Sequence, residues 1–238
     1  MKKLIIISSI SLTLIIVLCY ALNEISSSRT FQFFGGLVEK VKTEAPIVAL
    51  TFDDGPGVHT EDILNILREE EVQGTFFLTG KEIEAYQEDA IKIVEAGHEV
   101  GNHSYSHPRM ILRSPTFIKK EIEKTDEWIR QIGYEGEILF RPPYGRKFLF
   151  LPYYLHQQDR ETILWNLEPE TYPEIAVDSQ KIIDYVVTNI EPGSIILLHV
   201  MYESRRESLQ AVRGIIVSLK EQGYTFTTVS ELLKYDNQ

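Results

Sequence analysis

Acidic, basic and histidine side chains stand directly after several apolar segments of this 238-residue chain. In chain order these residues are Asp53, Asp54, His103, His107, Arg141, Tyr144 and His199. Carboxylates and imidazoles together can bind a divalent cation, and they can also accept or donate protons during catalysis. Because they come from segments far apart in the sequence, we expect the fold to bring them to one site.

His103 and His107 are four residues apart, so on a helical turn both imidazoles would face one point. With Asp54 nearby they would form a set of three ligands that leaves open positions for water, as in catalytic zinc sites. The same ligands also suit non-haem Fe(II), so a hydrolase and an Fe(II) oxygenase both remain open at this point. The plainer alternative is a pair of solvated surface histidines.

Arg141 lies next to an apolar segment, and a buried arginine needs an anionic partner. Asp53 is the natural candidate for that partner. Pro142, followed by a second proline, stiffens the next turn and would fix the backbone N–H of Tyr144. His199 ends the apolar run 194–198, and at the same rim as a metal site it becomes a candidate acid or base.

Short β-rich segments alternate with helix-like segments over the region that carries these residues. The expected strands are 46–52, 74–80, 98–104, 138–144, 162–167, 194–200 and 224–229. The expected helices are 60–71, 81–96, 116–132 (with a start at Ser114-Pro115), 178–190 and 205–221. Such alternation predicts a parallel α/β architecture, whose strand ends carry the chemistry. We expect one domain over 45–238, either an open sheet or a closed barrel.

The first 22 residues differ from the rest of the chain. Lys2 and Lys3 precede 19 uncharged residues, Leu4 to Leu22, which as a helix would span roughly the 30 Å hydrocarbon core. The lysines favour a cytoplasmic N-terminus. We expect a signal-anchor or a cleaved signal peptide at 1–22 and a polar linker at 23–44. Membrane contact would involve residues 4–22 alone, and the remainder would be exported, either anchored outside the cytoplasmic membrane or secreted.

Net charge and cysteine content exclude some classes of function. The chain has 24 Lys and Arg against 35 Asp and Glu, and the part after residue 22 carries 22 − 35 = −13. Nucleic acid is therefore not expected as a partner, since phosphate binding needs a basic face. The one Cys lies within the apolar segment and excludes an internal disulfide or a cysteine-based zinc finger.

Four motifs in this order resemble those of the polysaccharide deacetylase family, also called the NodB homology domain or carbohydrate esterase family 4. They are Thr51-Phe52-Asp53-Asp54-Gly55-Pro56, His103-Ser104-Tyr105-Ser106-His107-Pro108, Arg141-Pro142-Pro143-Tyr144-Gly145 and Leu197-Leu198-His199. The similarity runs from about Pro46 to about Leu233. It implies a distorted (β/α)7 barrel and hydrolysis of N-acetyl groups on a sugar polymer or oligomer, such as peptidoglycan or chitin.

The resemblance also implies a role for each matched residue. Asp54, His103 and His107 would bind one divalent metal ion, most often Zn²⁺, with Co²⁺ or another divalent ion as an alternative. The catalytic residues would be Asp53 as base, His199 as acid and Arg141, which would hold Asp53. The oxyanion and substrate contacts would come from Tyr144, Leu197 and Pro142.

One region departs from the family pattern. Thr171 stands where the family usually has an aspartate that supports the catalytic histidine, and Val200 stands where an acid often follows that histidine. Threonine cannot supply the negative charge that raises a histidine pKa, although Glu168 or Glu170 could reach instead. The alternative function is therefore a catalytically weak sugar-binding barrel of the same fold.

Overall fold

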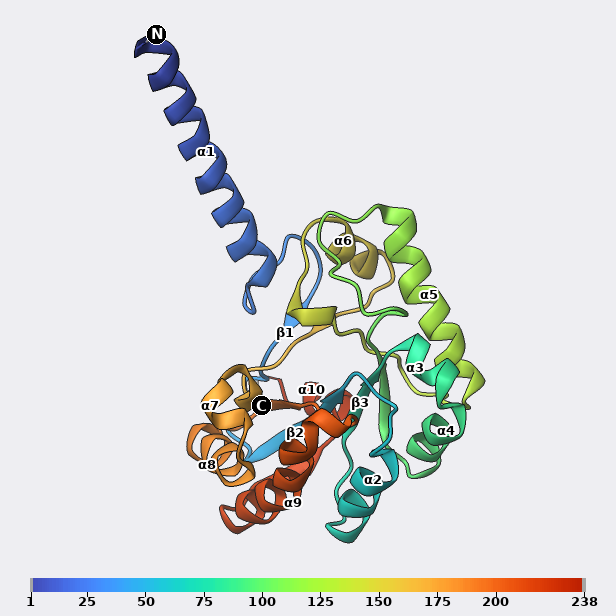
Figure 1. The fold of residues 1–238 in the computed structure, drawn as a ribbon. Helices are drawn as coiled ribbons and strands as arrows, with labels where there is room; N and C mark the ends of the chain where they lie inside the picture. The colour runs from blue at the N-terminus through green and yellow to red at the C-terminus, as the bar shows by residue number, and fades with distance from the viewer. Residues whose placement is uncertain (1, 237–238) are drawn as a thin grey trace.

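A computed structural model describes residues 2–236 as a parallel sheet surrounded by helices, with one long helix projecting from it (Figure 1). The strands are β1 (Leu37–Val38), β2 (Ile47–Asp53), β3 (Thr75–Leu78), β4 (Glu99–Asn102), β5 (Thr162–Ile163), β6 (Ile195–Leu198) and β7 (Thr225–Thr227). The helices are α1 (Lys2–Ser27), α2 (Thr60–Glu69), α3 (Gly80–Ala85), α4 (Gln87–Glu95), α5 (Pro115–Gln131), α6 (Phe150–Gln157), α7 (Pro173–Ala176), α8 (Ser179–Asn189), α9 (Arg206–Glu221) and α10 (Val229–Leu233).

Strand β2 is the centre of the sheet. It pairs in parallel with β3, β6 and β7, and β4 continues the sheet beyond β3. All seven residues of β2 are buried, because helices cover the sheet and leave no solvated face. Single parallel bridges extend the sheet from β4 through Phe140 to β5, and one more bridge joins Leu167 to Ile196 of β6. The parallel α/β prediction is confirmed, with the interrupted pairing expected of a distorted barrel.

Six of the seven expected strands are present, and the fourth is reduced to a bridge. Within 138–144, Phe140 pairs with Asn102 on one side and with Thr162 on the other. The ladder stops there because Pro142 and Pro143 have no N–H to donate. The last backbone bond is the Arg141 N–H to the Asn102 carbonyl, at 3.0 Å. The strand prediction for this segment is therefore wrong in length, while its position beside β4 is right.

The helices follow their apolar periodicity. Ile63 and Leu67 face the core from α2, and α5 is capped at its N-terminus by Ser114, whose side chain accepts the Phe117 N–H. The helix expected over 81–96 is broken at Tyr86 into α3 and α4. The sequence analysis did not predict α6, the short α7 and α10, or β1.

Helix α1 projects from the rest of the molecule (Figure 1). The stretch Ser9–Ser27 is long and apolar enough to cross a membrane, with mean hydropathy 1.7 and only 6% of it buried. After α1 the chain does not stay apart from the domain, because β1 pairs with β5 and Val41 is buried. The division into 1–22, 23–44 and 45–238 remains a prediction, and the structure adds that part of 23–44 packs on the sheet.

Candidate active site

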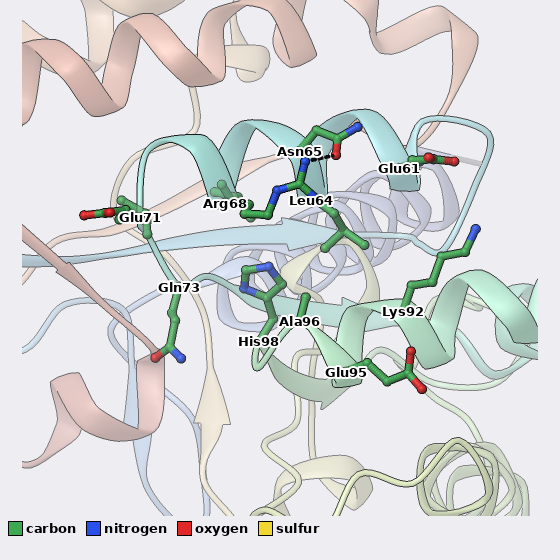
Figure 2. A pocket seen from close by; sticks show the side chains of 12 residues that line it. Glu61, Leu64, Asn65, Arg68, Glu71, Gln73, Lys92, Glu95, Ala96 and His98 are labelled. Atoms are coloured by element: carbon green, nitrogen blue, oxygen red, sulfur yellow. Dashed lines mark hydrogen bonds between the residues drawn. The ribbon is translucent and has the colours of Figure 1, made fainter.

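Two cavities are prominent in the structure, and they differ in their lining. A groove of about 530 Å³ lies between α2 and α4, near the start of β3 and β4 (Figure 2). A second cavity, of about 430 Å³, lies beyond the carboxyl ends of the strands and is called here the catalytic cavity. Its lining includes Asp53, Asp54, His103, His107, Tyr144, Leu197 and His199. The structure thus brings these residues together, as expected for chemistry at strand ends.

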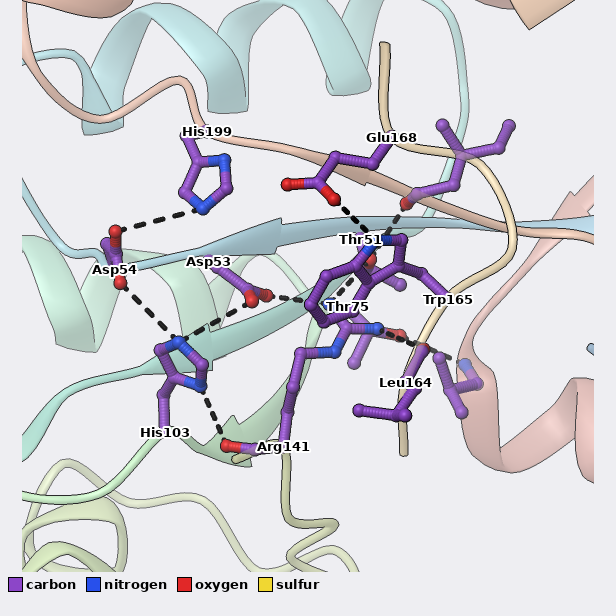
Figure 3. Close-up of polar contacts among 12 residues, drawn as sticks. Thr51, Asp53, Asp54, Thr75, His103, Arg141, Leu164, Trp165, Glu168 and His199 are labelled. Atoms are coloured by element: carbon purple, nitrogen blue, oxygen red, sulfur yellow. Dashed lines mark hydrogen bonds and ion pairs between the residues drawn. The ribbon is translucent and has the colours of Figure 1, made fainter. Parts of the chain in front are cut away.

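Asp53 is the last residue of β2 and is buried beside Arg141 (Figure 3). An Arg141 Nη1 donates to Asp53 Oδ1 at 2.6 Å and to the Thr51 hydroxyl at 2.8 Å, while Nη2 donates to the Leu164 carbonyl at 3.0 Å. The guanidinium is fully buried, so these partners compensate for its lost hydration. Asp53 Oδ2 remains, and it lies 3.5 Å from His103 Nε2. The expected pair of Asp53 and Arg141 is therefore present.

Asp54 turns the chain out of β2 with a left-handed φ of 72°. This turn brings the second carboxylate into the cavity beside the first, although neighbours on a strand point to opposite faces. Asp54 Oδ1 is buried and has no hydrogen-bond partner among the described residues 2–236. An ionised oxygen in that state is costly unless a cation compensates it.

His103 and His107 lie on a loop, not on the helical turn that their spacing suggested. Ser104 and His107 both have positive φ, which folds the loop so that the two rings lie 4.9 Å apart. The loop is held at its middle, since Ser106 donates through its N–H and its hydroxyl to the carboxylate of Glu121, at 2.8 and 2.9 Å. His103 Nδ1 lies 2.8 Å from the Arg141 carbonyl, so it donates there and leaves Nε2 facing the cavity.

The donor set fits a divalent metal ion. One ligand atom from each of Asp54, His103 and His107 lies within 4.8 Å of the other two. Asp54 Oδ1 is 3.5 Å from His103 Nε2 and 3.2 Å from His107 Nε2, and tetrahedral ligands about 2.0–2.1 Å from zinc would lie roughly 3.4 Å apart. Burial lowers the pKa of His103 to about 3, more than Asp54 can raise it, so the imidazole is neutral, as a ligand must be.

His199 is supported by Glu170, and Thr171 is not needed for this role. Glu170 Oε2 accepts from His199 Nδ1 at 2.5 Å, and its other oxygen accepts the His199 backbone N–H at 2.9 Å. Burial disfavours the imidazolium, but the hydrogen bond and charge of Glu170, with Asp53 and Asp54, outweigh it and raise the pKa of His199 to about 9. Thr171 instead donates to Glu168. The missing aspartate therefore does not leave this histidine without a negative partner, and one of the two suggested glutamates provides it.

The other expected contact residues have different surroundings. Tyr144 has a φ of 60° and places its ring 4.6 Å from that of His107, at the cavity wall. Leu197 is buried at the cavity floor. Pro142 is buried and accepts the Gly145 N–H at 2.9 Å within the turn, and it does not line the cavity. A direct substrate contact for Pro142 stays a prediction.

Four polar or charged wall residues were missed by the sequence analysis: Ser27, Arg29, Arg146 and Arg205. Ser27, the last residue of α1, and Arg29 line the catalytic cavity. Arg29 donates to Glu168 at 3.0 Å, and its guanidinium lies 4.8 Å from the centre of the Trp165 ring. From its sequence, the polar segment after the apolar helix is predicted to be a linker. Its contribution to the cavity wall is visible only in the tertiary structure.

Comparison with known proteins identifies the family of this chain. The polysaccharide deacetylase family model matches residues 40–154. Peptidoglycan-N-acetylmuramic acid deacetylase PdaC of Bacillus subtilis is 35% identical over 201 residues, which cover 84% of this chain and 41% of PdaC. A peptidoglycan-N-acetylglucosamine deacetylase of Bacillus cereus is 31% identical over 208 residues, which cover 84% of this chain and 94% of the relative.

Solved structures give the same result. A peptidoglycan N-acetylglucosamine deacetylase aligns with a TM-score of 0.78 and 30% identity, over 84% of this chain and 94% of that one. A pseudoenzyme of the CE4 family from Bacillus anthracis aligns with a TM-score of 0.75 and 28% identity, over 84% and 70%. The similarity covers 84% of this chain in both cases, and it confirms the family resemblance seen in the sequence. The chain therefore belongs to the polysaccharide deacetylase family.

Proposed function

We propose that this protein is a metal-dependent deacetylase that hydrolyses N-acetyl groups of an exported glycan, with peptidoglycan as the first candidate. The observation that carries the proposal is that the two carboxylate oxygens of Asp53 have different surroundings. One of its oxygens is held by Arg141, and the other faces the ligand set of Asp54, His103 and His107. A fixed base beside a metal site suits hydrolysis, and an Fe(II) oxygenase has no evident use for it.

Asp54, His103 and His107 would hold the ion, with Zn²⁺ as the first candidate and Co²⁺ as the second. When bound, such an ion polarises a carbonyl oxygen and lowers the pKa of water from about 15.7 toward 7. Mixed imidazole and carboxylate donors suit both ions.

Asp53 would act as the general base through Oδ2. Arg141 fixes the orientation of the carboxylate through Oδ1, so that Oδ2 would be free to accept the proton of the attacking water. A positioned base contributes typically about 10²–10⁴-fold to the rate. Burial of both residues excludes the solvent that would otherwise compete for this oxygen.

His199 would act as the general acid through Nε2. Glu170 accepts from Nδ1, which fixes the ring and favours a proton on Nε2, the nitrogen nearer Asp54. That proton would go to the departing amine nitrogen, because an unprotonated amine is a poor leaving group. The backbone N–H of Tyr144 would stabilise the negative oxygen that develops on the acetamide carbon, and Leu197 would contact the acetyl methyl.

The proposed substrate and location are supported by the relatives and by α1. Relatives named above are peptidoglycan deacetylases of both amino sugars, and peptidoglycan lies outside the cytoplasmic membrane. The apolar stretch of α1 would anchor the protein there or direct its export. We propose a glycan with N-acetylated sugars as the partner of the catalytic cavity.

Acetate release tests the proposal. The full chain, reconstituted in detergent, is incubated with peptidoglycan and with chitin oligomers, after treatment with EDTA and after return of Zn²⁺ or Co²⁺. We expect acetate from peptidoglycan only when the metal is present. The Asp53→Asn variant is the matched control for a metal site without its base.

The rivals give different results in the same assay. A sugar-binding pseudoenzyme would bind the glycan and release no acetate with any metal. An Fe(II) oxygenase would need oxygen, so equal acetate release under argon excludes it. Acetate formation that survives complete removal of the metal would contradict the proposed mechanism.

A further inference from the structure

A loop of the domain lies beside the apolar part of α1. Ile111, Leu112 and Phe148 line one side of a cavity of about 230 Å³, and α1 lines the other side with Cys19, Leu22, Asn23 and Ser26. Leu112 is 77% exposed and sits at the tip of this loop with a φ of 53°. If residues 4–22 cross the membrane, Cys19 and Leu22 lie at its outer margin, and Leu112 lies at the same depth.

More exposed aromatic side chains continue from this loop. Phe33 packs edge-on against Phe148 at 5.7 Å, Phe31 lies 5.3 Å from Phe33, and Phe34 lies 5.4 Å from Tyr153 of α6. Figure 1 shows α6 and the segment that follows α1 near the base of that helix. We call this surface the membrane face, made of Phe31, Phe33, Phe34, Ile111, Leu112 and Tyr153. Its exposed members have between 39% and 77% of their surface in solvent. Aromatic side chains at the margin of a bilayer are typical of membrane-bound proteins.

Charge also favours a lipid partner. Arg109 and Arg113 flank the segment Met110-Ile111-Leu112, in which Met110 is buried and Ile111 and Leu112 form the tip, and no acid lies between the two arginines. Both arginines are exposed, in a chain whose net charge is −11. Arginines beside an inserted apolar tip can keep their charged ends at the lipid phosphates while the tip enters the interface.

The contact between α1 and the domain is specific. Arg146 Nη1 donates to the Asn23 carbonyl at 3.1 Å and to its side-chain oxygen at 2.8 Å, and the Lys147 N–H donates to the Ser26 carbonyl at 3.0 Å. The Lys147 ammonium is buried and donates to the Ser28 carbonyl. These donors satisfy carbonyls at the end of α1 and place positive charge where the helix dipole is negative. The orientation of the domain against α1 is therefore fixed.

We propose that the membrane face rests in the headgroup region of the outer leaflet, so that the domain lies on the bilayer beside its own anchor. The occupant of this face is lipid, including anionic lipid near Arg109 and Arg113. This extends the membrane contact beyond residues 4–22.

The consequence for the substrate rests on the proposed function. Ser27 lines the catalytic cavity, and it follows Leu22 by five residues, or about 7.5 Å along a helix. The cavity wall is thus held close to the lipid headgroups. The glycan within reach is therefore one that is attached to the membrane or newly assembled at its surface, while mature wall farther out is not.

Site-directed spin labelling tests where the face lies. The full chain, with Cys19→Ser, carries a nitroxide at Leu112→Cys, Phe34→Cys or, as matched control, Val177→Cys, in vesicles of phosphatidylcholine and phosphatidylglycerol. Val177 is 70% exposed and follows α7, which Figure 1 shows farther than α6 from the N-terminal end of α1. We expect the ratio of oxygen to nickel-chelate collision rates to be several-fold higher at 112 and 34 than at 177.

Each other outcome overturns the proposal. Equal ratios at all three positions would show that the face is in water. Dipolar broadening at 112, lost on dilution with unlabelled protein, would show that a second copy covers it. Because collision rates need no turnover, failure here leaves acetate release from peptidoglycan as an independent test of the proposed function.

Discussion

The groove between α2 and α4 is larger than the catalytic cavity, about 530 Å³ against 430 Å³, yet its side chains are arranged very differently. Its charged residues lie on exposed helix surfaces, and Figure 2 shows Lys92 and Glu95 reaching outward from α4. Its histidine, His98, accepts the Gly74 N–H at 3.3 Å, and burial lowers the pKa of His98 to about 4. This histidine is therefore neutral, and its Nδ1 already accepts a backbone N–H.

The catalytic cavity instead contains buried charges that face one another. Asp53 is paired with Arg141, Glu170 with His199, and Asp54 keeps an unpartnered oxygen toward two imidazoles (Figure 3). Such an arrangement is costly unless a bound ion or a reaction uses it. Convergent buried charge is thus a better guide to function here than cavity size.

Replacing one histidine in each cavity gives the largest expected contrast. His103→Ala should lose the bound metal and reduce acetate release to background, because His103 Nε2 is one of the three proposed ligands. His98→Ala should keep both, and should lower the free energy of unfolding by about 1–3 kcal/mol, because the Gly74 N–H loses its partner. Metal analysis, acetate assays and urea denaturation measure these effects. Metal loss in the His98 variant would remove the distinction between the cavities.

Removing the base alone should have the next largest effect. Asp53→Asn should retain the metal, since Asp53 is not in the ligand set, and should lower turnover by about 10²–10⁴-fold. Glu95→Gln in the groove is the control for a lost carboxylate, and it should change neither the metal content nor the turnover. If Asp53→Asn also released the metal, Asp53 would have to be counted as a ligand.

The interaction of His199 with Glu170 predicts that the free energy of unfolding of the metal-free protein depends on pH. Its folded pKa, about 9, is above the ordinary 6.5, so its contribution is fully present below about pH 6.5 and is lost as pH rises through 9. Glu170→Gln removes the main cause of the raised pKa and should flatten this decline, while Thr171→Ala should not. Urea denaturation in EDTA between pH 6 and 10 follows the effect. An unchanged slope in the glutamate variant would show that Glu170 does not hold the proton on His199.

The smallest effect is expected in the groove. Arg68 is exposed on α2 and donates to Asn65 at 2.8 Å. Arg68→Ala should change the free energy of unfolding by no more than about 0.5 kcal/mol and leave acetate release unchanged. A large loss of activity would mean that the groove communicates with the catalytic cavity.

Much of the fold could be predicted because local patterns and tertiary structure agree. The buried strands β2 and β6 read as continuous apolar runs, and helices such as α5 carry both a cap and a periodic face. The pair of Asp53 and Arg141 could also be anticipated, since a buried arginine needs an anion.

Other features depend on geometry that sequence patterns do not specify. Periodicity cannot show that 103–107 is a loop, because its shape depends on positive φ at Ser104 and His107. Whether Glu168 or Glu170 reaches His199 depends on the short 3₁₀ turn Pro169–Thr171. The contribution of Ser27 and Arg29 arises from the docking of α1, which involves contacts more than 100 residues apart in sequence.

Left-handed backbone recurs around the catalytic cavity. Asp54, Ser104, His107 and Tyr144 all have φ between 52° and 72°, a region that costs non-glycine residues about 1–3 kcal/mol each. Glycine at Asp54, His107 or Tyr144 would relax the backbone while deleting a proposed ligand or a wall of the cavity. Loss of activity could therefore accompany a gain in stability in this fold. A descendant that is no longer selected for turnover could become more thermally stable through the same substitutions that remove its activity.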